Sequence, residues 1–155
     1  MSNDNLNEAE MQFVNAFSAL LAPWGLAPAT GKVLGFLFLK QKPVSVDEIA
    51  GALKMSRVGA WNSAKGLEAF GHIRSTTLSG TKKVLYSPSS DYSAVLVQQA
   101  QLIGSVGNLL RNCAENIAED SEAMDALSKR AHVYTALCHS MITKLEELMA
   151  EVSKG

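Results

Sequence analysis

Apolar residues recur every three or four positions in the N-terminal part of the chain, a spacing typical of helices. Residues 8–21 carry this pattern, and the Pro and Gly of the following "APWG" predict where the helix ends. A second helix is predicted from Pro28, which suits a first turn, toward Pro43. Because residues 33–39 are apolar on nearly every side, we expect the second helix to be buried.

Two short helices joined by a tight turn are predicted next. Ser45 can cap the first, which has an acidic first turn and ends near Leu53. Ser56 can cap the second, which runs to about Phe70 and is closed by Gly71.

The pattern changes to alternation over residues 73–86, on either side of "SGTKK", which predicts a two-stranded hairpin. Helix, turn, helix and hairpin is the order of a winged helix, whose second helix enters the DNA major groove. The expected fold is mainly α with a small β-hairpin wing. Residues 1–90 would form the winged helix-turn-helix head, and residues 91–155 a helical dimerisation region.

Two long stripes of apolar and small residues occupy the C-terminal part, the first after an expected cap at Ser90. They follow steps of three and four along residues 100–117 and 124–152. Two helices of one chain packing together would explain them, but a compact head leaves little surface to cover stripes this long. We therefore favour a bundle between two subunits, to which the N-terminal helix also contributes. The predicted interface residues are Leu110, Ile117, Leu127, Tyr134, Met141, Leu145 and Leu148.

The net charge of −1 hides an uneven distribution along the chain. Between Lys54 and Lys83, basic residues exceed the single acid, Glu68, by +5, so the remainder carries −6. A basic middle in an acidic chain indicates one surface that meets a polyanion. A solvated surface without a partner is the alternative that charge alone leaves open.

The helix after Ser56 has two sides of different character. Its inner side is expected to hold Ala60, Ser63, Ala64, Leu67 and Phe70. Its outer side carries Arg57, Trp61 and Lys65, spaced by four residues. A Trp between two cations suits a DNA sugar or a thymine methyl better than bulk water. The alternative is that another element covers Trp61 and makes it ordinary core.

The expected contacts to double-stranded DNA come from this helix and from the basic hairpin. Arg57 and Asn62 would reach base edges, whereas Lys65 would meet a phosphate. The full predicted set is Ser56, Arg57, Val58, Trp61, Asn62, Lys65, Arg74, Thr81, Lys82 and Lys83.

Two stretches, "APWGLAPATGKVLGFL" and "LEAFGHIR", resemble the MarR-type winged-helix regulators, specifically their GbsR-like branch. The resemblance covers residues from about Phe13 to Tyr86. It implies a homodimeric transcription regulator, expected to be a repressor. Some members respond to small ligands, choline in the GbsR case, which implies a small-molecule effector whose identity does not carry over.

The chain departs from the family pattern at two places. Trp61 stands where the resemblance implies a small polar residue, so we expect a different operator sequence. The wing tip reads "GTKK" where relatives tend to show Gly-Asp-Arg, so Thr81 and Lys82 replace an acid and an arginine that would brace and insert the wing. Because lysine lacks the planar fork of arginine, we expect the wing to contact phosphates and not bases.

An effector cavity is expected between the head and the dimerisation helices. The aromatic residues that would line it are Phe13, Phe17, Trp24, Phe36 and Tyr92, with ordinary core packing as the alternative.

Other chemistry in the sequence is sparse. His132 and His139 share a helix face but lie about 10 Å apart along it, too far to share a metal ion. Cys113 and Cys138 lack the paired spacing of a zinc site, and Cys138 falls on the apolar stripe. Since no hydrolase triad, phosphate loop or carboxylate pair is recognisable, we predict no enzymatic activity, no metal and no cofactor.

The polar, acidic N-terminus differs from a signal peptide, and no apolar run approaches the ~20 residues of a membrane span. We therefore expect a cytoplasmic protein without a membrane partner. The alternative function is a winged helix used only for protein contacts, with Trp61 as an interface anchor. The basic hairpin favours DNA.

Overall fold

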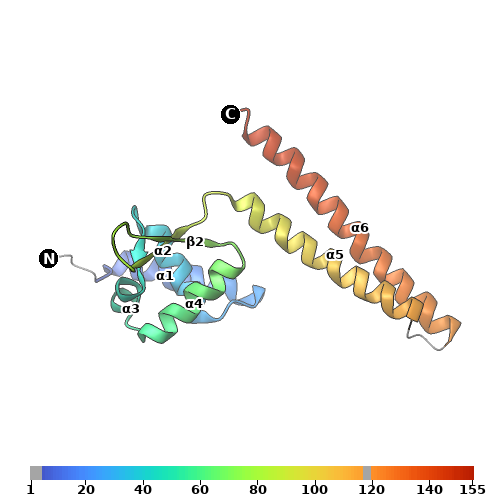
Figure 1. The fold of residues 1–155 in the computed structure, drawn as a ribbon, viewed down its shortest axis with the longest axis horizontal. Coiled ribbons are helices and arrows are strands. Elements are labelled where there is room, and N and C mark those ends of the chain that lie inside the picture. The colour runs from blue at the N-terminus through green and yellow to red at the C-terminus, as the bar shows by residue number, and fades with distance from the viewer. Residues whose placement is uncertain (1–4, 117–119) are drawn as a thin grey trace. The chain divides into compact units, whose positions relative to one another are not determined.

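The computed structural model describes residues 5–116 and 120–155, which form two compact units (Figure 1). The units divide between Ser90 and Asp91, and we call them the head and the helical hairpin. The head contains α1 (Glu8–Leu21), the 3-10 helix η1 (Ala22–Trp24), α2 (Pro28–Leu39), β1 (Val44–Ser45), α3 (Val46–Leu53), α4 (Arg57–Ala69), β2 (Ile73–Thr77) and β3 (Val84–Pro88). The helical hairpin consists of α5 (Tyr92–Asn116) and α6 (Ser121–Val152).

The core of the head is built around α2, as its apolar sequence predicts. Helix α1 packs closely on it because α2 carries glycine at the contact: a Cβ on Gly31 would lie 2.9 Å from the Cα of Ser18. Helices α3 and α4 and the sheet complete the enclosure. The largest buried side chains are Tyr86, Phe36, Leu37, Ile49, Leu67, Ile73, Val14 and Val33.

The predicted helix starts at Ser45 and Ser56 are both confirmed. Ser45 Oγ accepts from the amide of Glu48 at 3.3 Å, while the Glu48 carboxylate accepts from the amide of Ser45 at 2.6 Å, a capping box. Ser56 Oγ accepts from the amide of Gly59 at 3.0 Å. Lys54 turns the chain between the two helices in a left-handed conformation, with φ of 52°.

The predicted hairpin is present as β2 and β3, and β1 joins it as a third antiparallel strand in the order β1-β3-β2. On the central strand, Tyr86 lies between Val44 and Ser75. Strand β1 has no signal in the sequence, because two residues are too short to show alternation. Since α3 follows β1 directly, the sheet ties the wing to the start of the helix pair.

Helices α5 and α6 pack side by side in the helical hairpin (Figure 1). Glycines on α5 allow a close approach: a Cβ on Gly107 would lie 2.7 Å from Cγ2 of Thr135, and one on Gly104 would lie 2.7 Å from Sγ of Cys138. The two stripes are therefore matched in part within one chain, the alternative that the sequence left open. No helix in the described residues is both long and apolar enough to cross a membrane.

The cap of α5 differs from the expectation. Asp91, one residue after Ser90, accepts at Oδ1 from the amides of Ser93 at 3.1 Å and Ala94 at 3.4 Å. A carboxylate satisfies the free amides of a first helical turn as a serine would, and it also suits the helix dipole.

The residues predicted at the dimer interface fall into two groups. Those partly buried are Leu110, Leu127 and Leu145, whereas Ile117 lies outside the described residues. Tyr134, Met141 and Leu148, spaced by seven along α6, are exposed. Leu137 and Val152 extend this exposed row. An apolar stripe of α6, formed by these five residues, thus faces outward in the described part of the chain.

We predict that Ser45→Ala lowers the free energy of unfolding by about 1 kcal/mol, because it removes the side-chain half of the capping box. Hydrogen bonds from the amide and the hydroxyl of Ser45 hold the pKa of Glu48 below its usual 4.5. The stabilisation from Glu48 is therefore complete above pH 4.5 and declines as the pH falls below it.

Urea unfolding at neutral pH measures the first effect, with Ser79→Ala, at an exposed position between the strands, as the control. An NMR titration of Glu48 measures the second, and the variant should bring its midpoint closer to 4.5. Equal stability of the two serine variants would contradict the capping role.

Candidate nucleic-acid interface

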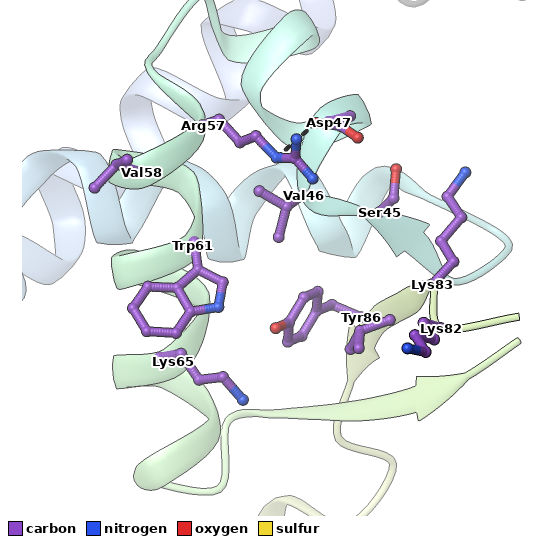
Figure 2. Close-up of a pocket in the computed structure, with 11 residues that line it drawn as sticks. Ser45, Val46, Asp47, Arg57, Val58, Trp61, Lys65, Lys82, Lys83 and Tyr86 are labelled. Atoms are coloured by element: carbon purple, nitrogen blue, oxygen red, sulfur yellow. Dashed lines mark ion pairs between the residues drawn. The ribbon is translucent and has the colours of Figure 1, made fainter.

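A groove of about 560 Å³ lies between α4 and the β-hairpin of the head (Figure 2). Its apolar lining comes from Val46, Val58, Trp61, Val84 and Tyr86. Its polar lining comes from Ser45, Asp47, Arg57, Lys65, Lys82 and Lys83. The groove thus brings the outer side of α4 together with the wing, as the sequence predicts for these two basic elements.

The packing of α4 decides which of its residues reach the groove. Ala60, Ser63, Ala64 and Leu67 are buried against the core, as predicted. The prediction for Phe70 is wrong, because it is 58% exposed: it follows the last helical residue and leaves the buried face. With its small residues inside, the helix presents Trp61 on the opposite side.

Trp61 is 49% exposed, so it is not the fully covered core residue of the alternative interpretation. Figure 2 shows its indole on α4 between Val58 and Lys65, facing the groove across from Tyr86. A half-exposed ring keeps one face available for contact with a sugar or a base methyl group.

Arg57, the first residue of α4, forms an ion pair with Asp47 of α3, with 3.0 Å between Nε and Oδ1 (Figure 2). Both side chains are largely exposed, so the pair adds little to stability. Its effect is on the position of the guanidinium, which lies at the end of the groove nearest α3.

Lys65 is also paired, with 2.9 Å from its Nζ to Oε2 of Glu68. The hydroxyl of Ser75 on β2 donates to the other oxygen of the same carboxylate. These hydrogen bonds, from Ser75 first and Lys65 second, lower the pKa of Glu68, and the bond to Glu68 raises the pKa of Lys65. Glu68 therefore links α4 to the wing and keeps the ammonium group at the groove.

The tip of the wing is held by Thr81, although the sequence suggested that this replacement removes a brace. The Thr81 hydroxyl donates to the carbonyl of Leu78 at 2.9 Å and accepts from the amide of Lys83 at 3.1 Å. Lys82 and Lys83 form no ion pair with any carboxylate in the described residues. Of the cations that line the groove, these two are therefore the ones without an ion pair in that part of the chain.

Not every predicted contact residue reaches the groove. Ser56, the cap before α4, and Asn62 on α4 are both exposed but do not line the groove. Arg74 stands on β2 next to Ser75 and directs its Nε to Ser89 Oγ at 3.3 Å, away from the groove lining. Neighbouring residues of a strand face opposite sides of the sheet. Because Ser75 faces α4, Arg74 faces the other side of the sheet.

The sequence did not predict the part that Asp47 and Tyr86 have in this groove. The acidic first turn after Ser45 predicts for Asp47 only a favourable place in a helix, and the alternation over residues 73–86 predicts for Tyr86 only a place in a strand. Their part in the groove depends on how α3 and the sheet pack beside α4. An acid ten positions before Arg57 carries no periodic signal of that contact.

The aromatic residues predicted to line an effector cavity mostly pack in the head. Phe17 contacts Phe13 and Phe38, with ring centroids 5.7 and 5.4 Å apart, and Phe36 is buried. Trp24 is 80% exposed on η1, and Tyr92 belongs to the helical hairpin. A small cavity of about 70 Å³ touches Phe36 together with Lys40, Val44, Glu48 and Ala52. Phe17 and Phe36 therefore match the core alternative, whereas Phe13 and Trp24 are exposed.

The remaining candidates for site chemistry stay apart. Cys113 and Cys138 are free thiols, both partly buried. The described residues contain no group of three His, Cys, Asp or Glu side chains placed to hold a metal ion.

No protein-family profile and no curated protein matches this sequence. A crystal structure of a transcriptional regulator matches with a TM-score of 0.77 at 19% identity, over 95% of this chain and 99% of that one. Apo MarR from E. coli matches with a TM-score of 0.43 at 21% identity, over 80% and 88%. A mutant MepR from S. aureus bound to an oligodeoxyribonucleotide matches with 0.44 at 13% identity, over 93% and 90%.

The first of these likenesses shows the fold: a mostly helical winged helix with a small antiparallel sheet and long C-terminal helices. The other two superpose too loosely to carry an argument.

We predict that Trp61→Ala costs less than about 1.5 kcal/mol of unfolding free energy, because a half-exposed ring loses only part of the burial of a core aromatic. Leu67→Ala, on the buried side of the same helix, is the matched comparison and should cost about 2–5 kcal/mol. Denaturant unfolding of both variants measures the difference. If Trp61→Ala lowered the unfolding free energy as much as Leu67→Ala, Trp61 would have to be a core residue.

Proposed function

We propose that the protein is a dimeric transcription regulator that binds double-stranded DNA through the groove between α4 and the wing. The observation that carries the proposal is the grouping of Arg57, Trp61 and Lys65 from α4 with Lys82 and Lys83 from the wing on one surface. These two elements are the ones with which winged helices meet the major groove and the backbone. The proposed protein catalyses no reaction and regulates transcription by binding to DNA.

Each side chain has a distinct part in the proposed complex. Lys65, Lys82 and Lys83 contact phosphates, which fixes the position of α4 on the duplex without reading its sequence. Trp61 and Val58 contact a sugar or a thymine methyl, and Arg57 reaches a base edge. Thr81 acts indirectly, by holding the wing turn that carries the lysines.

Dimerisation in this proposal uses the exposed apolar stripe of α6. Tyr134, Met141 and Leu148 repeat every seven residues, the spacing at which two helices meet along a seam. A second copy of the chain presents the same row, so a twofold axis can pair the stripes. Two heads would then meet half-sites about 34 Å apart.

The finer assignments follow the sequence resemblance described above. It supports a place near the GbsR-like branch, a repressor role and control by a small-molecule effector. Action in the cytoplasm follows from the polar N-terminus and the lack of a long apolar run in the sequence. An interaction module for proteins is the competing function, since Trp61 and Val58 expose apolar surface next to each other. The experiment below separates the two.

We predict that selection from random duplex DNA returns a preferred sequence bound by the wild-type protein. With ~6 to 8 phosphate contacts per dimer, the affinity should fall with salt at a log-log slope of roughly −5 to −7. Lys82→Ala with Lys83→Ala should make the slope shallower by roughly 3 to 4, equally on selected and unrelated DNA, because phosphate contacts carry no sequence information.

The control removes two lysines per chain from α6, Lys129→Ala with Lys144→Ala, and should leave the slope unchanged. Fluorescence anisotropy at several salt concentrations measures all three proteins. A flat salt dependence and no selected sequence would favour the protein-interaction module instead.

We also predict that Met141→Glu with Leu148→Glu converts a dimer into a monomer, because it places charges in the apolar seam. Thr143→Glu adds a charge to an exposed position of α6 outside the stripe and should leave the dimer intact. Sedimentation velocity measures the species, and circular dichroism checks that the helices remain. A monomeric wild type, or a double variant that still dimerises, would rule out this interface.

A further inference from the structure

The ion pair between Asp47 and Arg57 has a geometry that matters for base reading. The closest contact is made by Nε, on the flank of the guanidinium, at 3.0 Å from Oδ1. Among the described residues, no hydrogen bond engages the terminal nitrogens Nη1 and Nη2 of Arg57. The planar group therefore keeps its end free, and two parallel donors at that end match the O6 and N7 acceptors of a guanine.

The two residues are also attached to fixed points of the backbone. Asp47 belongs to the first turn of α3, which the capping box of Ser45 and Glu48 holds in place. Arg57 begins α4, which Ser56 caps. The helices themselves pack in one core through Ile49 and Ala60. The remaining freedom of Arg57 is that of its long side chain, and the carboxylate of Asp47 restricts it.

The charge of Asp47 lowers the affinity for a phosphate backbone. An exposed carboxylate beside the DNA surface repels phosphates and neutralises part of the charge of Arg57. A surface selected only for tight binding to any DNA would be better without it. A carboxylate that restrains the arginine lowers the ordering entropy still to be lost when the guanidinium docks on a base. Asp47 therefore weakens non-specific binding through its charge, whereas it favours specific binding by restraining Arg57.

From this geometry we infer that Asp47 is a positioning residue for sequence recognition: it orients Arg57 so that the terminal edge of its guanidinium reads a guanine in the operator. The inference rests on the proposed function, because it requires α4 to enter the major groove. It assigns Asp47 no DNA contact of its own. The ligand feature it specifies is one guanine in each half-site.

The test compares selected sequences and affinities for wild-type protein, Asp47→Asn and Glu8→Gln. Asparagine keeps the size of the side chain and removes its charge, while Glu8→Gln removes the same charge from the exposed first turn of α1. For Asp47→Asn we expect the preference for guanine at one position per half-site to drop about threefold, because an exposed ion pair restrains the arginine only weakly. Non-specific affinity should stay equal or rise. Glu8→Gln should keep the guanine preference.

A second comparison shows whether Asp47 acts through Arg57. In the background of Arg57→Ala, the change Asp47→Asn should have no further effect on base preference, since the oriented group is gone. An independent contribution of Asp47 would instead appear in both backgrounds. Thermal unfolding of each variant confirms that it is folded.

The outcomes separate the inference from the function on which it rests. A wild type that selects no sequence refutes the proposed function and this inference with it. A wild type that selects an operator, together with an Asp47→Asn variant that keeps the guanine preference, refutes the inference alone. Stronger specific binding by Asp47→Asn with the guanine retained would mean that Asp47 merely withholds Arg57 from DNA, which also overturns it.

Discussion

The close packing of α4 on the core is the constraint from which the rest of the head follows. Its inner side carries Ala60, Ser63 and Ala64, so the helix axis lies near the core and leaves no space there for a large ring. Trp61, one position after Ala60, is rotated from it by about 100° and therefore points away from the core. The wing, tied to the same core through Tyr86, stands across from it, and the groove is what remains between them.

The electrostatics of this groove are more balanced than the count of charges along the chain suggests. Counting between Lys54 and Lys83 includes Glu68 as the only acid. The fold adds Asp47 from α3, so both cations of α4, Arg57 and Lys65, stand beside a carboxylate. The wing lysines lack such partners among the described residues. The groove thus has two cations held in position on the helix and less restrained cations on the wing. Of the helix cations, Arg57 suits a base edge and Lys65 a phosphate, while the wing lysines suit phosphates.

Local signals in the sequence predicted the local parts of the structure. Caps at Ser45 and Ser56, the helix periods and the hairpin depend on neighbouring residues, and all are confirmed. Two local predictions were wrong, the cap at Ser90 and the burial of Phe70. The contacts that the sequence did not predict are distant along the chain. β1 exists because β3 pairs with it, and the contact of Asp47 with Arg57 depends on the packing of two helices.

The apolar stripes of α5 and α6 also show that the sequence does not identify which elements pack together. Heptad spacing predicts that a helix face will be covered, but it does not name the covering partner. Gly104 and Gly107 let α5 of the same chain take part of that role. These glycines were the signal in the sequence that α5 packs closely against another helix of the same chain.

The two tryptophans provide the most direct measurement of the central claim, that DNA lies in the groove beside α4. Trp61 lines the groove, whereas Trp24 is 80% exposed on η1 and is not among the groove residues. The indole N–H resonances of both can be followed by NMR while a selected duplex is added. Our account predicts a saturable shift of the Trp61 resonance at the stoichiometry of binding, with Trp24 unchanged. A bound complex in which Trp61 keeps its free resonance would contradict it.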